Sequence, residues 1–160
     1  IIKKFIDLKT EPITDSDYDI HIYTCINIEN ESIMAGIYFK EYDIYNTGFC
    51  LNNKYDNKTG NLVLLIRLAS ILKENLLLNK KILIYTESKY SIKCCTKFGQ
   101  QNEKINWTKK IHNLELVRNV YDLYKNYKNI NFHLLDNKNS DKHKDNINKT
   151  LTISKSNSEK

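Results

Sequence analysis

The chain has 160 residues, enough for one domain with a buried hydrophobic core. Hydrophobic residues make up 41% of the sequence and charged residues 28%, which is typical of a globular domain. The longest apolar run, Leu62–Ile66, is far shorter than the roughly 20 residues that a membrane span requires, and no secretory signal pattern opens the chain. We therefore expect neither a membrane protein nor a secreted one.

The net charge of +6 favours a negatively charged partner such as a nucleic acid. Codon bias is an alternative explanation, since the sequence is crowded with Lys, Asn, Ile and Tyr and holds one Pro and four Gly. The four cysteines form no C-x-x-C pair, and the adjacent Cys94 and Cys95 do not suit one tetrahedral zinc site together. We predict reduced thiols in an intracellular protein, in either the cytoplasm or the nucleus.

The first part of the chain is predicted to form strands. Residues 1–17 are interpreted as a leader segment or as a strand contributed to a neighbouring segment, and the start at Ile1 suggests a processed product or a domain cut from something longer. Three runs rich in β-branched and aromatic residues follow, at 19–26, 32–40 and 42–51. Short polar links join the three runs, which predicts antiparallel strands.

The middle of the chain alternates between helix and strand patterns. A polar loop at 52–58 leads to a helix that we predict to start at an Asn61 cap and to run to about Asn75, with its apolar residues on one face. The apolar run at 81–86 is typical of a central parallel strand, and a helix is expected at 88–97. Strands joined through helices run parallel, so this part extends the sheet with parallel strands.

The last third combines a polar excursion, a helix, a strand and a tail. Residues 99–110 form the excursion, which carries the single Trp. An amphipathic helix at 114–127 and a strand at 130–135 complete a domain that we place at 18–135. Residues 136–160 are predicted to be a polar tail with at most one marginal helix, because they can bury little apolar surface. The predicted fold class is α/β, with a mixed sheet covered by helices on both faces.

Short motifs on these elements resemble those of ribonuclease H. Tyr23-Thr24-Cys25 resembles the Tyr-Thr-Asp of the family's opening strand, and Tyr85-Thr86-Glu87-Ser88 resembles its Tyr-Thr-Asp-Ser core strand. Thr59-Gly60-Asn61 is similar to the family's Thr-Asn-Gln before the first helix, and Trp107 followed by residues 111–116 resembles the end of its substrate-gripping excursion. The resemblance covers the whole predicted domain and implies a ribonuclease-H-like five-stranded sheet, in which three antiparallel strands are followed by parallel ones.

The resemblance also implies that the catalytic site is degenerate. The family cuts the RNA strand of RNA–DNA hybrids with two divalent ions held by four carboxylates. Its opening-strand Asp falls on Cys25, its helix Glu on Leu64 (or Leu65 in the alternative register), its core-strand Asp on Glu87 and its last Asp on Asn148. Magnesium requires hard oxygen ligands and negative charge, and one acid of four remains. We therefore predict a non-catalytic domain with no metal site and no cofactor.

The excursion is the predicted nucleic-acid-binding segment, because active relatives use a comparable basic segment to grip the DNA backbone. The candidate residues are Lys97, Lys104, Trp107, Lys109 and Lys110. Lysines can contact phosphates, and an aromatic ring can contact sugars. The alternative is a solvated loop whose Trp packs against the next helix. The family's mobile His falls on Lys138, which leaves no histidine at that place.

No hydrolase triad or phosphate-binding glycine loop occurs in the sequence. His21 and His133 lie within predicted strands, where a hydrogen-bonded imidazole is the expected role, whereas His112 and His143 lie in polar surroundings. The leading hypothesis is an inactive ribonuclease-H-like module from a virus, mobile element or reduced parasite, which docks on RNA–DNA hybrid, another nucleic acid or a protein within a larger assembly. The alternatives are an active nuclease with displaced metal ligands and a purely structural interaction domain.

Overall fold

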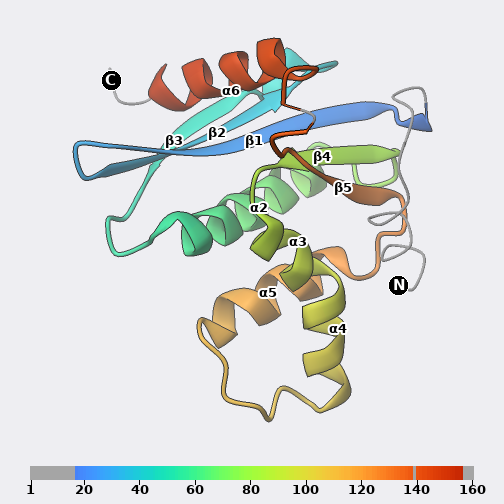
Figure 1. Cartoon of the computed structure of the whole chain (residues 1–160). Coiled ribbons are helices and arrows are strands. Elements are labelled where there is room, and N and C mark those ends of the chain that lie inside the picture. Colours follow the sequence, from blue (N-terminus) through green and yellow to red (C-terminus); the bar gives the residue numbers. More distant parts are fainter. Residues whose placement is uncertain (1–16, 139, 157–160) are drawn as a thin grey trace.

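The sheet begins with an antiparallel meander of three strands (Figure 1). The computed structural model describes residues 17–138 and 140–156, and its first strands are β1 (Ile20–Glu29), β2 (Ser32–Phe39) and β3 (Thr47–Leu51). A two-residue turn joins β1 to β2, and both of its residues have positive φ, as the right-handed twist of a hairpin favours. The predicted meander is confirmed.

The third predicted strand is shorter than expected. Its first half is a 3-10 turn, η2 (Asp43–Tyr45), in which the Ile44 side chain is 81% exposed. The Asn46 side-chain oxygen accepts a 2.7 Å hydrogen bond from the backbone N–H of Phe39, which closes this turn against the end of β2. Because Ile44 has no core to face, the apolar run at 42–46 does not continue the strand.

Helix α2 (Asn57–Glu74) starts earlier than predicted, and its cap is Asp56 and not Asn61. The Asp56 carboxylate accepts a 2.9 Å hydrogen bond from the backbone N–H of Thr59, and the Thr59 hydroxyl accepts one of 2.9 Å from the backbone N–H of Asp56. This reciprocal capping box also lowers the pKa of the Asp56 carboxyl, chiefly through the bond from the Thr59 backbone. Residues 57 and 58, predicted as loop, are therefore helical.

Two parallel strands complete the sheet. β4 (Ile82–Thr86) pairs with β1, and β5 (Ile130–Leu134) pairs with β4, so the strand order is β3-β2-β1-β4-β5. All five residues of β4 are buried, as expected for a central strand. The predicted mixed five-stranded α/β sheet is confirmed.

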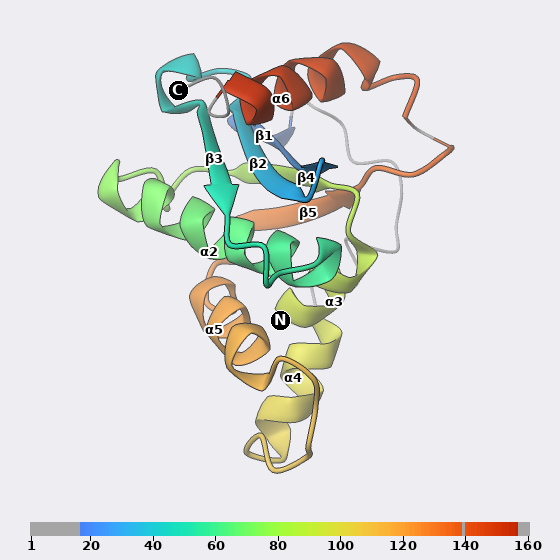
Figure 2. The same ribbon diagram turned by 90° about the vertical axis from the view of Figure 1, so that its left-hand side faces the viewer.

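Three short helices connect β4 to β5. They are α3 (Lys89–Cys95), α4 (Lys97–Lys104) and α5 (Leu114–Tyr124). Figures 1 and 2 show that α4, α5 and the loop between them project from the side of the sheet that α2 covers. The predicted excursion at 99–110 is therefore helical in its first half, which the polar composition did not reveal.

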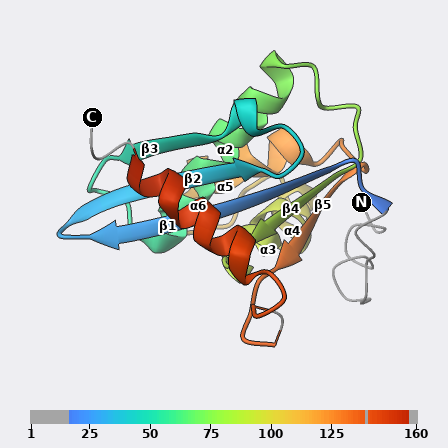
Figure 3. The same ribbon diagram turned by 90° about the horizontal axis from the view of Figure 1, so that it is seen from above.

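The predicted polar tail contains a helix that covers the other face of the sheet. α6 (Lys144–Ser156) lies across β1, β2 and β3 (Figure 3). Beneath it are apolar and aromatic side chains of the strands, and its own buried residues are the small Thr150 and Ser154. The one helix that the tail was expected to hold, at most and marginally, is present at 144–156 and packs on the sheet, whereas residues 157–160 and the predicted leader up to residue 16 lie outside the described residues. Among the described helices, none is both long enough and apolar enough to cross a membrane.

Candidate functional site

Cys25 and Glu87 lie side by side where β1 continues past the end of β4. The parallel register pairs Tyr23 with Tyr85, and two residues further along each chain come Cys25 and Glu87. The Cys25 side chain is 8% exposed, whereas Glu87 is exposed. Burial, with a smaller contribution from the negative charge of Glu87, raises the pKa of the Cys25 thiol to about 11. At neutral pH this position therefore carries no charge.

The helix position of the family's glutamate lies in the hydrophobic core. Leu64 is 0% exposed and Leu65 is 1% exposed, so either register puts a buried leucine there. The α2 residues that form this core also include Leu62 and Leu68. An alkyl side chain in this environment offers neither a ligand atom nor charge to a cation.

Asn148 lies apart from Cys25 and Glu87. It is exposed on α6 and lines a groove between α6 and the end of β2. The α6 residue whose side chain comes within hydrogen-bonding reach of the Cys25 thiol is Ser154. Lys138 is exposed in the loop before α6. The structure thus brings two of the four degenerate positions together, Cys25 and Glu87.

These residues do not fit the two divalent ions that active ribonucleases H use. They supply a neutral thiol, an alkyl group, an outward-facing amide and one carboxylate. In the part of the chain that the structure describes, no group of three or more His, Cys, Asp or Glu side chains is placed to hold a metal ion. A pair of magnesium ions needs several inward-pointing oxygen ligands with negative charge, and one carboxylate does not provide them.

Trp107 of the predicted nucleic-acid-binding segment is packed inside the protein. Its side chain is 8% exposed, its ring centroid lies 6.1 Å from that of Tyr121, and the Arg118 guanidinium lies 5.9 Å from its centroid. Asn106 and Trp107 both have positive φ, which turns the chain back so that the indole reaches α5. The expected aromatic surface for sugars is therefore absent from this loop, and the alternative of a Trp packed against the helix describes the structure.

The four lysines of the segment remain exposed. Lys97 and Lys104 stand at the two ends of α4, and Lys109 and Lys110 follow in the loop to α5. Each has an exposed side chain, and none makes an ion pair with another described residue. The segment therefore presents four uncompensated positive charges on a projecting part of the molecule (Figure 2).

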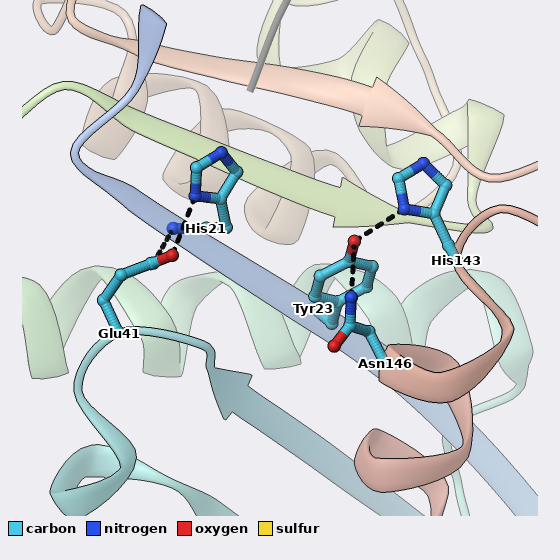
Figure 4. Close-up of polar contacts among 5 residues, drawn as sticks. All are labelled: His21, Tyr23, Glu41, His143 and Asn146. Atoms are coloured by element: carbon cyan, nitrogen blue, oxygen red, sulfur yellow. Dashed lines mark hydrogen bonds and ion pairs between the residues drawn. The ribbon is translucent and has the colours of Figure 1, made fainter. Parts of the chain in front are cut away.

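A buried tyrosine–histidine cluster under α6 was not predicted. The Tyr23 and Tyr85 rings stack with their centroids 4.0 Å apart, and the Tyr23 hydroxyl lies 2.6 Å from Nδ1 of His143 (Figure 4). The Asn146 amide nitrogen donates a 3.2 Å hydrogen bond to the same hydroxyl. The Tyr23 hydroxyl thus makes hydrogen bonds with two residues at the start of α6, which ties that end of the helix to β1. His143, expected in polar surroundings, is 6% exposed.

His21 occupies the same face of β1 as Tyr23, two residues earlier. Its Nδ1 lies 3.0 Å from the Glu41 carboxylate, and that carboxylate also accepts a 2.6 Å hydrogen bond from the His21 backbone N–H (Figure 4). This agrees with the expected role of a hydrogen-bonded strand histidine. The signal that could have revealed the cluster is the alternation along β1, since His21 and Tyr23 share one face of the strand.

The sequence matches no protein-family model and no curated protein. The fold, however, matches solved structures. The protease–reverse transcriptase of prototype foamy virus matches with a TM-score of 0.66 and 13% identity over 91% of this chain and 21% of that chain. A foamy viral protease–reverse transcriptase solved in complex with an RNA/DNA hybrid gives a TM-score of 0.62 and 16% identity over 92% of this chain and 21% of that chain.

Isolated domains match as well. The RNase H domain of prototype foamy virus gives a TM-score of 0.58 and 12% identity over 75% of this chain and 80% of that chain. RNase H1 from the archaeon Halobacterium salinarum NRC-1 gives 0.53 and 13% identity over 76% and 89%. The chain thus spans about a fifth of the length of the foamy virus protease–reverse transcriptase that it matches. The sheet order, the helix placement and these matches together show that the chain has the ribonuclease-H-like fold.

Proposed function

We propose that the chain is a catalytically inactive ribonuclease-H-like domain that binds nucleic acid, with RNA–DNA hybrid as the first candidate, inside a larger assembly. The observation that carries this proposal is the neutral, buried Cys25 thiol beside Glu87, where the family places two carboxylates. At the position of a third carboxylate of the family's site stands Leu64, which is buried in the core. Without several carboxylates, the site has nothing to offset the cost of stripping water from two divalent ions.

Nucleic-acid binding is supported by charge. Lys97, Lys104, Lys109 and Lys110 project on one segment without ion-pair partners among the described residues. Lysines that meet phosphates release counterions from the duplex, which supplies affinity without sequence preference. The foamy viral neighbours were solved in complex with RNA/DNA hybrid and with dsDNA, which makes these two duplexes the first to test. This chain covers 21% of the foamy virus protease–reverse transcriptase that it matches, which supports a place for such a domain within a larger assembly.

The test combines cleavage and binding by the full chain. A labelled RNA–DNA hybrid is incubated with the protein in magnesium and in manganese, and binding is measured by fluorescence anisotropy over a range of salt concentrations. We expect intact RNA in both metals and binding that weakens with salt. Changing Lys109→Glu and Lys110→Glu together is expected to make the slope of log K against log salt shallower by about two, because two phosphate contacts are lost.

The matched control reverses the charge of two lysines that lie just before the N-terminal ends of the parallel strands β4 and β5. Lys80 and Lys128 are exposed and precede β4 and β5, so Lys80→Glu with Lys128→Glu makes the same change in net charge away from the segment. Hybrid binding by this variant is expected to stay within about twofold of wild type at moderate salt. Cleavage that disappears in Glu87→Gln would instead identify a nuclease with displaced ligands. Absence of binding even at low salt would identify a purely structural domain.

A further inference from the structure

The Tyr85 ring stands at the centre of a group of histidines on the face of the sheet that α6 covers. Three of the four histidines of the chain, His21, His133 and His143, surround it, with ring centroids 6.1, 5.4 and 5.0 Å from that of Tyr85. They come from β1, from β5 and from the residue directly before α6. The His133 and His143 rings also lie 5.6 Å apart. Side chains that gain a proton in mildly acidic solution are therefore gathered at one place.

His143 belongs to the contact by which α6 begins on the sheet. Its side chain is buried, and its Nδ1 lies 2.6 Å from the hydroxyl of Tyr23 on β1 (Figure 4). Its backbone oxygen accepts a 2.9 Å hydrogen bond from the backbone N–H of Ile147, so the residue stands at the N-terminus of the helix. The imidazole is thus placed where the helix, β1 and β4 meet.

A proton on His143 costs free energy while α6 is docked. Burial removes water from the imidazolium ion. The N-terminus of a helix carries partial positive charge, so a cation there is disfavoured. The His133 ring is close enough for two imidazolium ions to repel each other. All three costs fall when the helix leaves the sheet, because His143 then enters water and moves away from His133.

The other titratable groups around the cluster add little net charge among the described residues. The Nδ1 of His21 lies 3.0 Å from the Glu41 carboxylate, which provides a counter-charge for a proton on that ring. The hydroxyls of Tyr23 and Tyr85 are neutral in mild acid. The loop before α6 and its first turn carry acids and lysines in equal numbers, all exposed: Asp136, Lys138, Asp141, Lys142, Lys144 and Asp145. The response to acid therefore depends on His143 and His133.

We propose that α6 is an acid-released cover of the sheet: protonation of His143, reinforced by His133, detaches the helix in mildly acidic solution while the α2 side stays folded. The direction follows from proton linkage. Because the released state takes up the proton more readily, docking has its full stability above the ordinary imidazole pKa of about 6.5 and weakens as pH falls below it. This inference does not depend on nucleic-acid binding, since the α4–α5 segment projects from the other side of the sheet (Figure 1).

The experiment measures amide hydrogen exchange of the full chain at pH 7.5 and pH 5.5, corrected for the intrinsic effect of pH on exchange. Release with uptake of one proton is expected to lower the protection of α6 by about tenfold over this range, and uptake of two protons by up to about a hundredfold. The protection of α2 is expected to stay nearly constant. Binding of a hydrophobic dye should rise over the same range, because the tyrosine cluster becomes exposed.

The pH range separates this event from general acid unfolding. Carboxyl groups with ordinary pKa values near 4 remain ionised at pH 5.5, so histidines are the side chains that titrate in it. An equal loss of protection in α2 and α6 would indicate global unfolding and contradict the proposal. Unchanged protection of α6 would contradict it as well.

Three variants test which imidazole is responsible. His143→Asn keeps a polar group near the place of Nδ1 but cannot be protonated, so the ratio of α6 protection between the two pH values is expected to shrink to within about threefold. His133→Phe keeps a ring against Tyr85 and is expected to limit the ratio to about tenfold, because one titrating group remains. His112→Asn is the matched control, since His112 is exposed in the loop before α5 and its loss should leave the ratio as in wild type.

The ratio is informative even if His143→Asn lowers protection at both pH values, because lost packing affects both alike. A wild-type ratio in His143→Asn would overturn the assignment. In NMR spectra of the wild-type chain, the midpoint of α6 release is expected to coincide with the midpoint of the His143 ring titration. Release at a pH unrelated to that titration would show that another group controls the helix.

Discussion

At the scale of single residues, the thiol of Cys25 determines what the centre of the sheet can do. Burial raises its pKa to about 11, so the side chain is neutral under physiological conditions and a weak nucleophile. Ser154 and the backbone of Gly36 lie within hydrogen-bonding reach of the sulfur, which ties it into the contact between α6 and β2. A group that is small, neutral and buried suits packing at this position better than it suits ion binding.

Replacing this thiol by a carboxyl tests that view. In Cys25→Asp, burial and the nearby Glu87 charge are expected to raise the pKa of the introduced carboxyl above its unfolded value of about 3.9. Because its pKa is higher in the folded state, the carboxyl is tolerated at low pH. As pH rises, the free energy of unfolding falls, by about 1.4 kcal/mol for each unit by which folding raises this pKa. The measurement is the free energy of unfolding in urea at pH 4 and pH 7, relative to wild type.

Cys25→Ser is the control, since it keeps a small neutral group and is expected to show the same difference from wild type at both pH values. Should Cys25→Asp be as stable at pH 7 as at pH 4, this position would accept a charged carboxylate, and the proposed loss of ion binding would lose its main support.

At the scale of secondary-structure elements, α6 approaches the sheet closely because two strand positions are glycine. A Cβ at Gly36 would lie 2.5 Å from the backbone oxygen of Thr150, and a Cβ at Gly48 would overlap the backbone oxygen of Ile153. The buried residues on the helix are correspondingly small, Thr150 and Ser154. Close approach of two backbones thus replaces the apolar stripe by which amphipathic helices are usually recognised.

Adding one methyl group to the strand tests this contact. Gly36→Ala is expected to lower the free energy of unfolding by about 1–3 kcal/mol, because the backbone of α6 must move away from β2. Gly60→Ala is the matched control: the nearest atom to its Cβ is the end of the Leu51 side chain, at 3.3 Å, and the position is helical. That variant is expected to be neutral or up to about 1 kcal/mol more stable. Equal effects of the two variants in thermal or urea unfolding would contradict this account of α6.

The same contact explains which parts of the fold could be predicted from the sequence. Runs of β-branched and aromatic residues predict strands β1, β2 and β4, and the spacing of apolar residues predicts α2. Helix α6 has no comparable signal, since polar residues dominate it and its stability depends on glycines more than a hundred residues earlier. Local composition carries no information about such a partner.

The candidate site shows the same division. Cys25 and Glu87 could be placed together from strand motifs alone, because parallel register follows from the fold. The position of Asn148 could not, since its side of α6 is fixed by how that helix lies on the sheet. The burial of Trp107 could be offered only as one of two alternatives, because it depends on two consecutive residues in the left-handed conformation, one of them the Trp itself.

At the scale of the whole molecule, the two faces of the sheet have different cores. The α2 side is a large and mainly aliphatic core, whereas the α6 side is a small cluster of Tyr23, Tyr38, Leu83, Tyr85 and Leu135 with buried His143 beside it. The second cluster has α6 as its main cover in the described structure. The packing of this face of the sheet therefore depends on residues 144–156.

Removing that helix gives a prediction at this scale. A chain that stops after Asp136 is expected to lose cooperative unfolding and to bind a hydrophobic dye, because the tyrosine cluster is then exposed to water. Circular dichroism melting and dye fluorescence provide the measurements. A cooperative melt close to that of the full chain would show that α6 is dispensable. Adding the helix back as a synthetic peptide should restore part of the transition, since the contact surfaces remain intact.

The burial of Leu64 limits how a metal site could be built into this domain by substitution. Leu64→Glu would bury an unpaired carboxylate in the mainly aliphatic core, at a cost of several kcal/mol against a total stability of about 5–15 kcal/mol. Further carboxylates, beginning with one at Cys25, would be needed before that carboxylate met a cation to compensate it. Each single substitution is therefore destabilising by itself, so the packing of the core opposes a stepwise gain of metal binding at this place.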